Sequence, residues 1–278
     1  MPELVRLSLN APVTVIYALM YSVWAVLILG ELAWDRKGRL GLYRHDGLLT
    51  NLAMYAGFSV IGLFWAHAVF WIYTLAAQVK VLSLGSGYWH LFAQGGWKEW
   101  LQLFVLEDLS FYVFHRCHHR NGFLWLAHVP HHSSRDFNLS TALRQTWTPF
   151  TAVVFWVPLA LLGFDPLMIM TAQMCSLFYQ FFLHTRLIGS LGPLEWVLNT
   201  PSHHRVHHGC NAPYVDKNFG GVMILWDRLF GTYAREERAR PVAFGVEPPV
   251  DTANPARIAL GAYATWWRSL RRSGKAAG

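Results

Sequence analysis

The sequence predicts an all-α, multi-span integral membrane protein, and two observations support this fold class. Of the 278 residues, 54% are hydrophobic and only 14% are charged, whereas about 25% of the residues of an average soluble domain are charged. Several apolar runs also approach the roughly 20 residues that a helix needs to cross a bilayer. The 14 tryptophans suit two membrane interfaces, where aromatic side chains concentrate.

The apolar runs follow one another along the chain. Three of them are predicted to be membrane-spanning helices, at 12–34, 48–78 and 97–114. The third carries Glu107 and Asp108 near its C-terminal half. Two shorter runs, 149–163 and 166–182, are separated by a predicted turn ending at Pro166, which suits the first position of a helix. This pair is predicted to form either two spans or a re-entrant hairpin.

The basic residues between the spans orient the chain. The segments 35–46 and 115–148 and the tail after 184 are rich in Arg and Lys, whereas 80–98 holds only Lys80 and Lys98. Because basic residues concentrate in cytoplasmic loops, the N-terminus is predicted outside and the histidine-rich segments on the cytoplasmic side. The net charge of +7 is therefore attributed to topology, and no nucleic-acid partner is expected.

Residues 1–278 are predicted to form a single membrane-embedded domain. Near its C-terminus, the segment 256–272 is predicted to be a helix in which apolar and aromatic residues mix with arginines. A helix lying on the membrane surface and a simple solvated terminus are both compatible with it. The three cysteines are widely separated and none belongs to a Cys-x-x-Cys pair, which argues against a disulfide framework, a zinc ribbon and an iron–sulfur cluster.

Histidines carry the strongest functional signal. Eleven of the 14 lie between residues 115 and 208. They form clusters at His115, His118 and His119, at His128, His131 and His132, at His184, and at His203, His204, His207 and His208. Neutral imidazole is the commonest metal ligand, so these clusters predict a metal site built from several segments. His45, His67 and His90 are interpreted as ordinary isolated histidines.

The spacing of the clusters has a geometric meaning. His115 and His119 are four residues apart, so they share one face of a helix. Tyr112 and Asp108 lie on that face one and two turns deeper, and the Asp108 carboxylate is predicted to pair with a histidine N–H or an arginine. In the two His-x-x-His-His groups, one short helical segment can give ligands to two metals.

The number of histidines points to two metal ions. A hydrolytic zinc needs only three protein ligands, and neither the His-Glu-x-x-His signature nor the deaminase signature occurs. The supply exceeds the needs of one ion about two- to three-fold. All-nitrogen ligation with open positions suits iron that activates O2, so a di-iron site is predicted.

Three stretches of the chain resemble a known family. They run from Glu107 to His119, from Trp125 to Arg144 and from His204 to Thr232. Their motifs resemble those of the fatty acid hydroxylase/sterol desaturase superfamily of membrane di-iron enzymes, over roughly residues 104–234. The motifs His-His-Ser-Ser and Asp-Lys-Asn-Phe-Gly-Gly are most similar to those of the alkylglycerol monooxygenase-like branch.

The resemblance implies a set of site residues. The implied metal ligands are His115, His119, His128, His131, His132, His184, His204, His207 and His208. His118 and His203 are interpreted as extra histidines, and Ile188 stands where some family members have a further histidine. Asp108, Tyr112, Asn138 and Asn211 are expected behind the ligands or on the substrate side.

The resemblance also implies the activity. The expected protein is an O2-dependent oxidoreductase with two iron ions, cycling between Fe2+ and Fe3+, that hydroxylates or desaturates a lipid such as an alkylglycerol ether lipid, a sterol-like lipid or a fatty acyl chain. Its partners would be the bilayer, the lipid and an external reductant, either a reduced pterin or a separate electron-transfer protein. The expected location is a bacterial inner membrane, or the endoplasmic reticulum of a eukaryote. The sequence leaves the oligomeric state open.

Two other functions compete with this hypothesis. One is a membrane metal-handling or transport protein, since ionisable residues in membranes often mark ion paths. The other is a membrane scaffold with a structural metal. The histidines are predicted at the membrane edge and the spans are poor in paired charges, which favours the enzyme.

Overall fold

The computed structural model describes residues 11–79, 81–82, 84 and 96–276. Its α-helices are α2 (Ala11–Gly38), α3 (His45–Val79), α4 (Gly96–Arg120), α5 (Gly122–His132), α6 (Val157–Leu161), α7 (Pro166–Phe181), α8 (Pro201–His207), α9 (Leu225–Leu229) and α10 (Pro255–Ala276). Four 3-10 helices lie between them, η1 (Leu139–Leu143), η2 (Pro149–Thr151), η3 (Val153–Phe155) and η4 (Gly192–Trp196). Within these ranges the only β-type pairs are two isolated bridges, so the all-α prediction is confirmed there.

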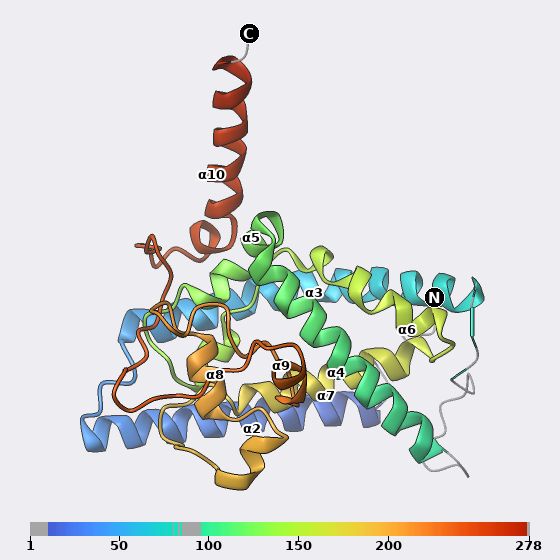
Figure 1. The fold of residues 1–278 in the computed structure, drawn as a ribbon, viewed down its shortest axis with the longest axis horizontal. Coiled ribbons are helices and arrows are strands. Elements are labelled where there is room, and N and C mark those ends of the chain that lie inside the picture. The colour runs from blue at the N-terminus through green and yellow to red at the C-terminus, as the bar shows by residue number, and fades with distance from the viewer. Residues whose placement is uncertain (1–10, 80, 83, 85–95, 277–278) are drawn as a thin grey trace.

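The helices α2 and α3 run lengthwise through the molecule (Figure 1). Both have the length and composition to cross a membrane, over Ala18–Gly38 and His45–Val79. Only 17% and 11% of the residues in their most apolar stretches are buried inside the protein. The core helix of a soluble protein would bury most of its apolar residues, so two exposed apolar helices support a membrane protein.

The further spans predicted from the sequence are not confirmed. The stretch 97–114 of α4 holds Lys98, Glu99, Glu107 and Asp108, and α4 is not among the candidate spans of the described residues. The helix α7 has 16 residues, about 24 Å at 1.5 Å per residue, which is shorter than a bilayer core of about 30 Å. A third span therefore stays a prediction.

The region 149–182 forms a bent pair of short limbs. The first limb breaks into η2, η3 and α6, and the chain turns at Gly163, whose φ of +92° favours glycine. The helix α7 then begins at Pro166, and the Asp165 carboxylate accepts a hydrogen bond from Leu167 N at 2.8 Å. The predicted turn and helix start are confirmed.

A hydrophobic core holds α4 in place beside α3, α6 and α7. Its buried residues include Tyr73 of α3, Leu103 and Phe111 of α4, Leu159 of α6 and Ile169 of α7. Phe111 lies one helical turn before His115, so this core fixes the end of α4 that carries histidines.

A buried carboxylate ties α2 to the same region. Glu31 accepts hydrogen bonds from the Tyr43 hydroxyl at 2.6 Å and from Leu139 N at 2.7 Å, and also from the Thr185 hydroxyl. Thr185 directly follows His184. The side chain of Glu31 thus joins the first described helix to segments that flank the histidines, a link that the sequence did not reveal.

The membrane orientation remains a prediction. Of the low-charge segment 80–98 on which it depends, residues 80, 83 and 85–95, which include His90, lie outside the described residues. The predicted C-terminal helix is confirmed, since α10 covers 255–276.

Candidate metal centre

Four segments supply the histidines. They are the end of α4, the helix α5, residue 184 just after α7, and the helix α8 with the residue that follows it. The side chain of Asn121, between α4 and α5, accepts hydrogen bonds from Phe123 N at 3.0 Å and Leu124 N at 3.1 Å. This cap starts α5 immediately after α4 ends, so the chain folds back and the histidines of the two helices meet.

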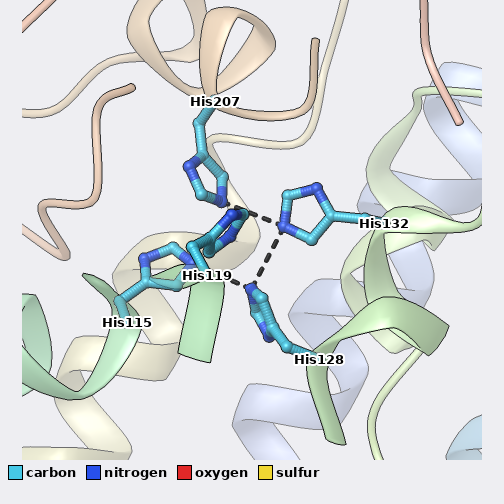
Figure 2. A group of neighbouring side chains, drawn as sticks. All are labelled: His115, His119, His128, His132 and His207. Carbon is cyan, nitrogen blue, oxygen red and sulfur yellow. Dashed lines mark hydrogen bonds between the residues drawn. The ribbon is translucent and has the colours of Figure 1, made fainter. Parts of the chain in front are cut away.

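The nine histidines predicted as ligands gather in two groups. The five-histidine group consists of His115, His119, His128, His132 and His207, and the four-histidine group consists of His131, His184, His204 and His208. Within each group all the potential ligand atoms lie within 4.8 Å of one another. Figure 2 shows the rings of the five-histidine group converging from different helices.

The two groups indicate how the nine histidines would be divided between two metal ions, which the sequence left open. In both His-x-x-His-His motifs, the two histidines that are four residues apart enter one group and the middle histidine enters the other. The helix α5 thus gives His128 and His132 to the five-histidine group and His131 to the other. Each short helix serves both groups because residues four apart share a face and the residue between them points elsewhere.

The ring nitrogens have the spacing of a coordination shell. In the five-histidine group, His128 Nε2 lies 2.9 Å from His115 Nε2 and 3.1 Å from His132 Nε2. In the four-histidine group, His184 Nε2 lies 3.0 Å from His204 Nε2 and 3.3 Å from His131 Nε2. Two imidazole nitrogens bound at right angles to an ion at about 2.1 Å would be about 3.0 Å apart.

Hydrogen bonds on the outer side of the rings fix their tautomers. His115 Nδ1 lies 2.8 Å from Phe219 O, His207 Nδ1 lies 3.0 Å from Lys217 O, and His184 Nδ1 lies 2.9 Å from Gln180 O. A carbonyl oxygen can only accept, so each Nδ1 must carry the proton. The Nε2 atoms therefore present lone pairs to the interior of each group.

The interior of the groups contains polar atoms without partners. His119 Nε2 and His208 Nε2 are buried and have no hydrogen-bond partner. Buried polar atoms are normally paired, and converging lone pairs repel unless a cation lies between them. The histidines of the two groups therefore fit a pair of metal ions.

Burial keeps these rings neutral. Removal from water lowers the pKa of His131 to about 4 and lowers the pKa of His132 and His208 well below the ordinary value. Neutral imidazole is the form that binds a metal, so the ligand sets are ready to bind at neutral pH without a proton having to leave first.

A short outer loop, residues 216–219, supports the five-histidine group. The Phe219 carbonyl contacts His115 and the Lys217 carbonyl contacts His207. In the same loop, Asp216 Oδ1 lies 3.5 Å from His119 Nδ1. The hydrogen bond from His119, followed by the ion pair with Arg120, holds the pKa of Asp216 below its usual value. Three of the five rings are therefore oriented by four consecutive residues.

The outer loop has an unusual backbone that needs support. Asp216 and Asn218 have φ angles of +59° and +54°, in the left-handed region that Asp and Asn tolerate better than most residues. The buried Asp227 carboxylate accepts hydrogen bonds from Phe219 N and Gly220 N, both at 2.7 Å. These bonds fix the direction of the Phe219 carbonyl toward His115.

The predicted contact of Asp108 with a histidine or an arginine is wrong. Its carboxylate accepts hydrogen bonds from Val222 N at 2.7 Å, Met223 N at 3.1 Å and Trp226 Nε1 at 2.9 Å. At the level of Asp108, the face of α4 that carries His115 packs against the residues that follow the outer loop. Backbone N–H groups of those residues therefore stabilise the Asp108 carboxylate.

Tyr112, Asn138 and Asn211 also make structural contacts rather than contacts with the histidine nitrogens. The Tyr112 hydroxyl lies 3.0 Å from Thr232 Oγ1. Asn138 Nδ2 donates to Leu42 O at 2.8 Å, and Asn211 Nδ2 donates to Pro241 O at 3.1 Å. These contacts satisfy polar groups of nearby loops, and the expectation that the three residues lie behind the ligands or on the substrate side stays a prediction.

The extra histidines lie outside both groups. His118 Nδ1 lies 2.9 Å from Phe114 O, and its Nε2 lies 3.0 Å from Thr151 Oγ1. His203 packs against the Tyr233 ring, with centroids 5.5 Å apart. The side chain of Ile188, at the position of a possible further ligand, is 43% exposed and adds no ligand to the four-histidine group.

Two buried arginines hold the ligand segments, and neither was singled out from the sequence. Arg205 forms a two-bond ion pair with Glu236, at 2.8 and 2.7 Å, and donates to Thr185 O at 2.8 Å. Arg144 Nε donates to Pro130 O at 2.9 Å, between the histidines of α5. Both arginines lie within or beside the histidine motifs, but spacing alone does not reveal their partners.

Comparisons with known proteins agree with the motif analysis. Residues 100–232 match the family model for fatty acid hydroxylase. Alkylglycerol monooxygenase of Homo sapiens is 45% identical over 160 residues, 57% of this chain and 35% of that protein. An ornithine lipid hydroxylase of Rhizobium tropici is 27% identical over 157 residues, 56% of this chain and 47% of that protein. Cholesterol 25-hydroxylase of Homo sapiens is 29% identical over 139 residues, 46% of this chain and 48% of that protein.

These matches have a limited extent. The chain spans about a third of the length of the alkylglycerol monooxygenases that it matches, 35% for the human protein. No solved structure matches it. Over the matched region, the resemblance to the superfamily and to its alkylglycerol monooxygenase-like branch is confirmed.

The first prediction separates ligands from bystanders. His119→Ala, His132→Ala and His208→Ala should each lower the bound iron, because each removes a nitrogen from one of the two groups. His118→Ala and His203→Ala should keep the iron of the unaltered chain, because their rings lie outside both groups. Elemental analysis of the five purified variants measures this, and equal losses in all five would contradict the grouping.

The second prediction concerns Asp216. Asp216→Asn keeps a residue that tolerates the left-handed backbone but removes the negative charge next to His119. Iron affinity should fall about 10- to 100-fold, the usual effect of losing a partner behind a ligand. Competition with a chelator measures the affinity. Arg120→Gln is the matched control, because it removes only the outer ion pair and should leave the affinity nearly unchanged; equal affinity in all three proteins would refute the role.

The third prediction concerns Asp108. In Asp108→Asn, an amide NH2 group would replace one of the oxygens that accept from three donors, leaving buried donors unpaired at a cost of about 1–3 kcal/mol each. The thermal unfolding midpoint of the metal-free protein should fall. Asp165→Asn, at a helix start that Asn also caps well, is the control. Loss of iron from Asp108→Asn with no change in stability would instead place Asp108 in the metal site.

Proposed function

We propose that residues 100–232, the stretch that matches the fatty acid hydroxylase family, form the catalytic part of a membrane-bound non-haem di-iron oxygenase that oxidises a C–H bond of a lipid. The observation that carries the proposal is the convergence of nine neutral imidazoles into two adjacent groups. The names of the similar proteins, which refer to an alkylglycerol, an ornithine lipid and cholesterol, support a lipid substrate.

The histidines would hold the two irons with nitrogen ligands alone. Iron bound there would supply the reduction of O2 by two external electrons and the transfer of one oxygen atom into a C–H bond, while the other oxygen leaves as water. The protein's part is to hold the ions in fixed places. The carbonyl and carboxylate acceptors behind the rings do this by preventing them from turning.

A shell of aromatic rings would keep bulk water from the centre. The buried Phe219 ring packs against His119 with centroids 5.1 Å apart. On the other side, the buried Phe137 ring stacks on His184 at 5.7 Å and on Phe244 at 4.8 Å. Trp125 packs against His119 at 5.0 Å. Exclusion of water would protect an oxidising centre from side reactions.

The substrate and the reductant are further parts of the proposal. An ether lipid of the alkylglycerol kind is favoured among lipids by the 45% identity to an alkylglycerol monooxygenase. A reduced pterin or a separate electron-transfer protein would deliver the electrons at the cytoplasmic side, where the distribution of basic residues predicts the site. Hydroxylation is favoured over desaturation because the similar proteins are named as a monooxygenase and hydroxylases.

The competing function is metal handling or transport across the membrane. Against it, the lone pairs of each group face inward and are enclosed by buried rings, which suits a resident ion better than a passing one. The two functions differ in measurable ways, because an oxygenase keeps its metal and consumes O2, whereas a transporter releases it.

The fourth prediction tests the oxygenase. Iron-loaded protein in liposomes is given labelled O2, a reduced pterin or a general electron donor, and separately an alkylglycerol, a sterol and a fatty acyl lipid. One lipid should gain one labelled oxygen atom, measured by mass spectrometry. His132→Ala should be inactive and His118→Ala active. Stable iron without O2 consumption for any lipid and donor, or uptake of metal into the liposomes, would contradict the proposal.

A further inference from the structure

The helix α10 has an apolar side and a basic side. Its segment 255–276 contains five basic residues and no acidic residue. At about 100° per residue, the apolar residues Ile258, Leu260, Tyr263, Trp266, Trp267 and Leu270 occupy one side of the helix. Arg257, Arg268, Arg271 and Arg272 occupy the other.

Only the first half of this apolar side is covered by the rest of the protein. Ile258 and Ala259 are buried against Met54 of α3. Tyr263 and Trp266 contact the Phe123 ring of α5, with centroids 6.2 and 5.3 Å away. The second half projects away from the body (Figure 1), and there Trp267 is 53% exposed and Leu270 47% exposed.

The packing fixes α10 across the direction of the candidate spans. In Figure 1, α2 and α3 run lengthwise, and α10 stands transverse to them, rising from the body beside α5. A membrane crossed by α3 would therefore have α10 running along its surface and not through it.

The length of α3 sets the level of α10. The 35 residues of α3 extend about 52 Å, well beyond a bilayer core of about 30 Å. Its first turns hold the buried polar residues Thr50 and Asn51, so the excess length belongs at this end. Met54, the contact of α10, comes just after them. The helix α10 thus leaves the body close to the level where the apolar part of α3 begins.

We propose that α10 binds the surface of a bilayer that contains anionic lipids, with Trp266, Trp267 and Leu270 in the headgroup boundary and Arg268, Arg271 and Arg272 against the lipid phosphates. Tryptophan suits this boundary because its ring is apolar and its N–H is polar. Basic residues are attracted by anionic lipids. The helix α5 carries three of the nine histidines, and contact with it means that α10 would hold the metal centre at a fixed height above the bilayer.

The test places a spin label on each side of α10 in the full chain. Leu270→Cys labels the apolar side and Ala264→Cys labels the polar side, in a variant whose Cys117, Cys175 and Cys210 are serine and whose iron content is checked. The proteins are placed in nanodiscs of phosphatidylcholine with or without phosphatidylglycerol. With the anionic lipid, the label at 270 should be shielded from a water-soluble nickel relaxant and accessible to O2, and the label at 264 should show the reverse.

A charge variant tests the role of the arginines. Replacing Arg268, Arg271 and Arg272 by Gln should lower the ratio of bound to free α10 about 100-fold in anionic discs, at roughly 5-fold per charge. The matched control replaces Arg235, Arg238 and Arg240, which are exposed and off the helix, and should have little effect. Hydrogen exchange of α10 in the unaltered chain should be slower in anionic than in neutral discs. This measurement tests the contact of α10 with the bilayer without labels.

Three results would overturn the proposal. They are equal accessibility of the two labels in anionic discs, equal loss in both charge variants, and spin coupling between labels at 270, which would mean that a second copy covers the apolar side. Each of these is independent of iron binding and turnover, so the proposed function and the role of α10 fail or stand separately.

Discussion

The structure of the centre depends on one electrostatic constraint, the convergence of many neutral nitrogen lone pairs in a buried space. Such a cluster is unfavourable unless a cation occupies it, and each ring must be prevented from turning its nitrogen away. The carbonyl groups of Phe219, Lys217 and Gln180 meet the second requirement by accepting the outer N–H of their rings. The fold around the centre is therefore arranged to aim backbone oxygens as much as to place histidines.

Buried carboxylates hold the loops that flank the histidines. Glu31, Asp108 and Asp227 are almost fully buried, and a buried charge is costly unless it is hydrogen-bonded. Among the described residues, none of the three accepts a hydrogen bond from a histidine nitrogen; each instead accepts hydrogen bonds from backbone N–H groups of loops that flank the histidines. The backbone N–H groups of each loop stabilise the buried carboxylate, and the same hydrogen bonds fix the conformation of the loop. The stability of the carboxylate and that of the loop therefore depend on each other.

The sequence predicted which nine histidines gather, in part because helical spacing is a local property; that they bind metal stays a prediction. His115 and His119, or His128 and His132, share a face whatever the rest of the fold does, and the two groups follow from it. The partner of Asp108 could not be predicted in the same way. Its position on the face of His115 was correct, but at its level that face meets residues 222–226, more than 110 positions later in the chain. The outer loop was likewise visible as a motif, whereas the direction of its carbonyls depends on left-handed backbone at Asp216 and Asn218.

The membrane part was harder to predict because composition does not fix which apolar runs cross. The stretch 97–114 of α4 is apolar enough to suggest a span, yet the carboxylates of Glu107 and Asp108 are both buried inside the protein. A helix that turns two carboxylates into the protein interior and ends in two histidines of the five-histidine group is better understood as a support for the centre. Exposed apolar side chains lie along α2 and α3, and α4 also exposes Trp97, Leu101 and Val113. The first turns of α3 contact the segment that follows α5, with Asn51 Nδ2 donating to Ser140 Oγ at 3.0 Å, so a candidate membrane span is joined directly to the segment next to a histidine-bearing helix.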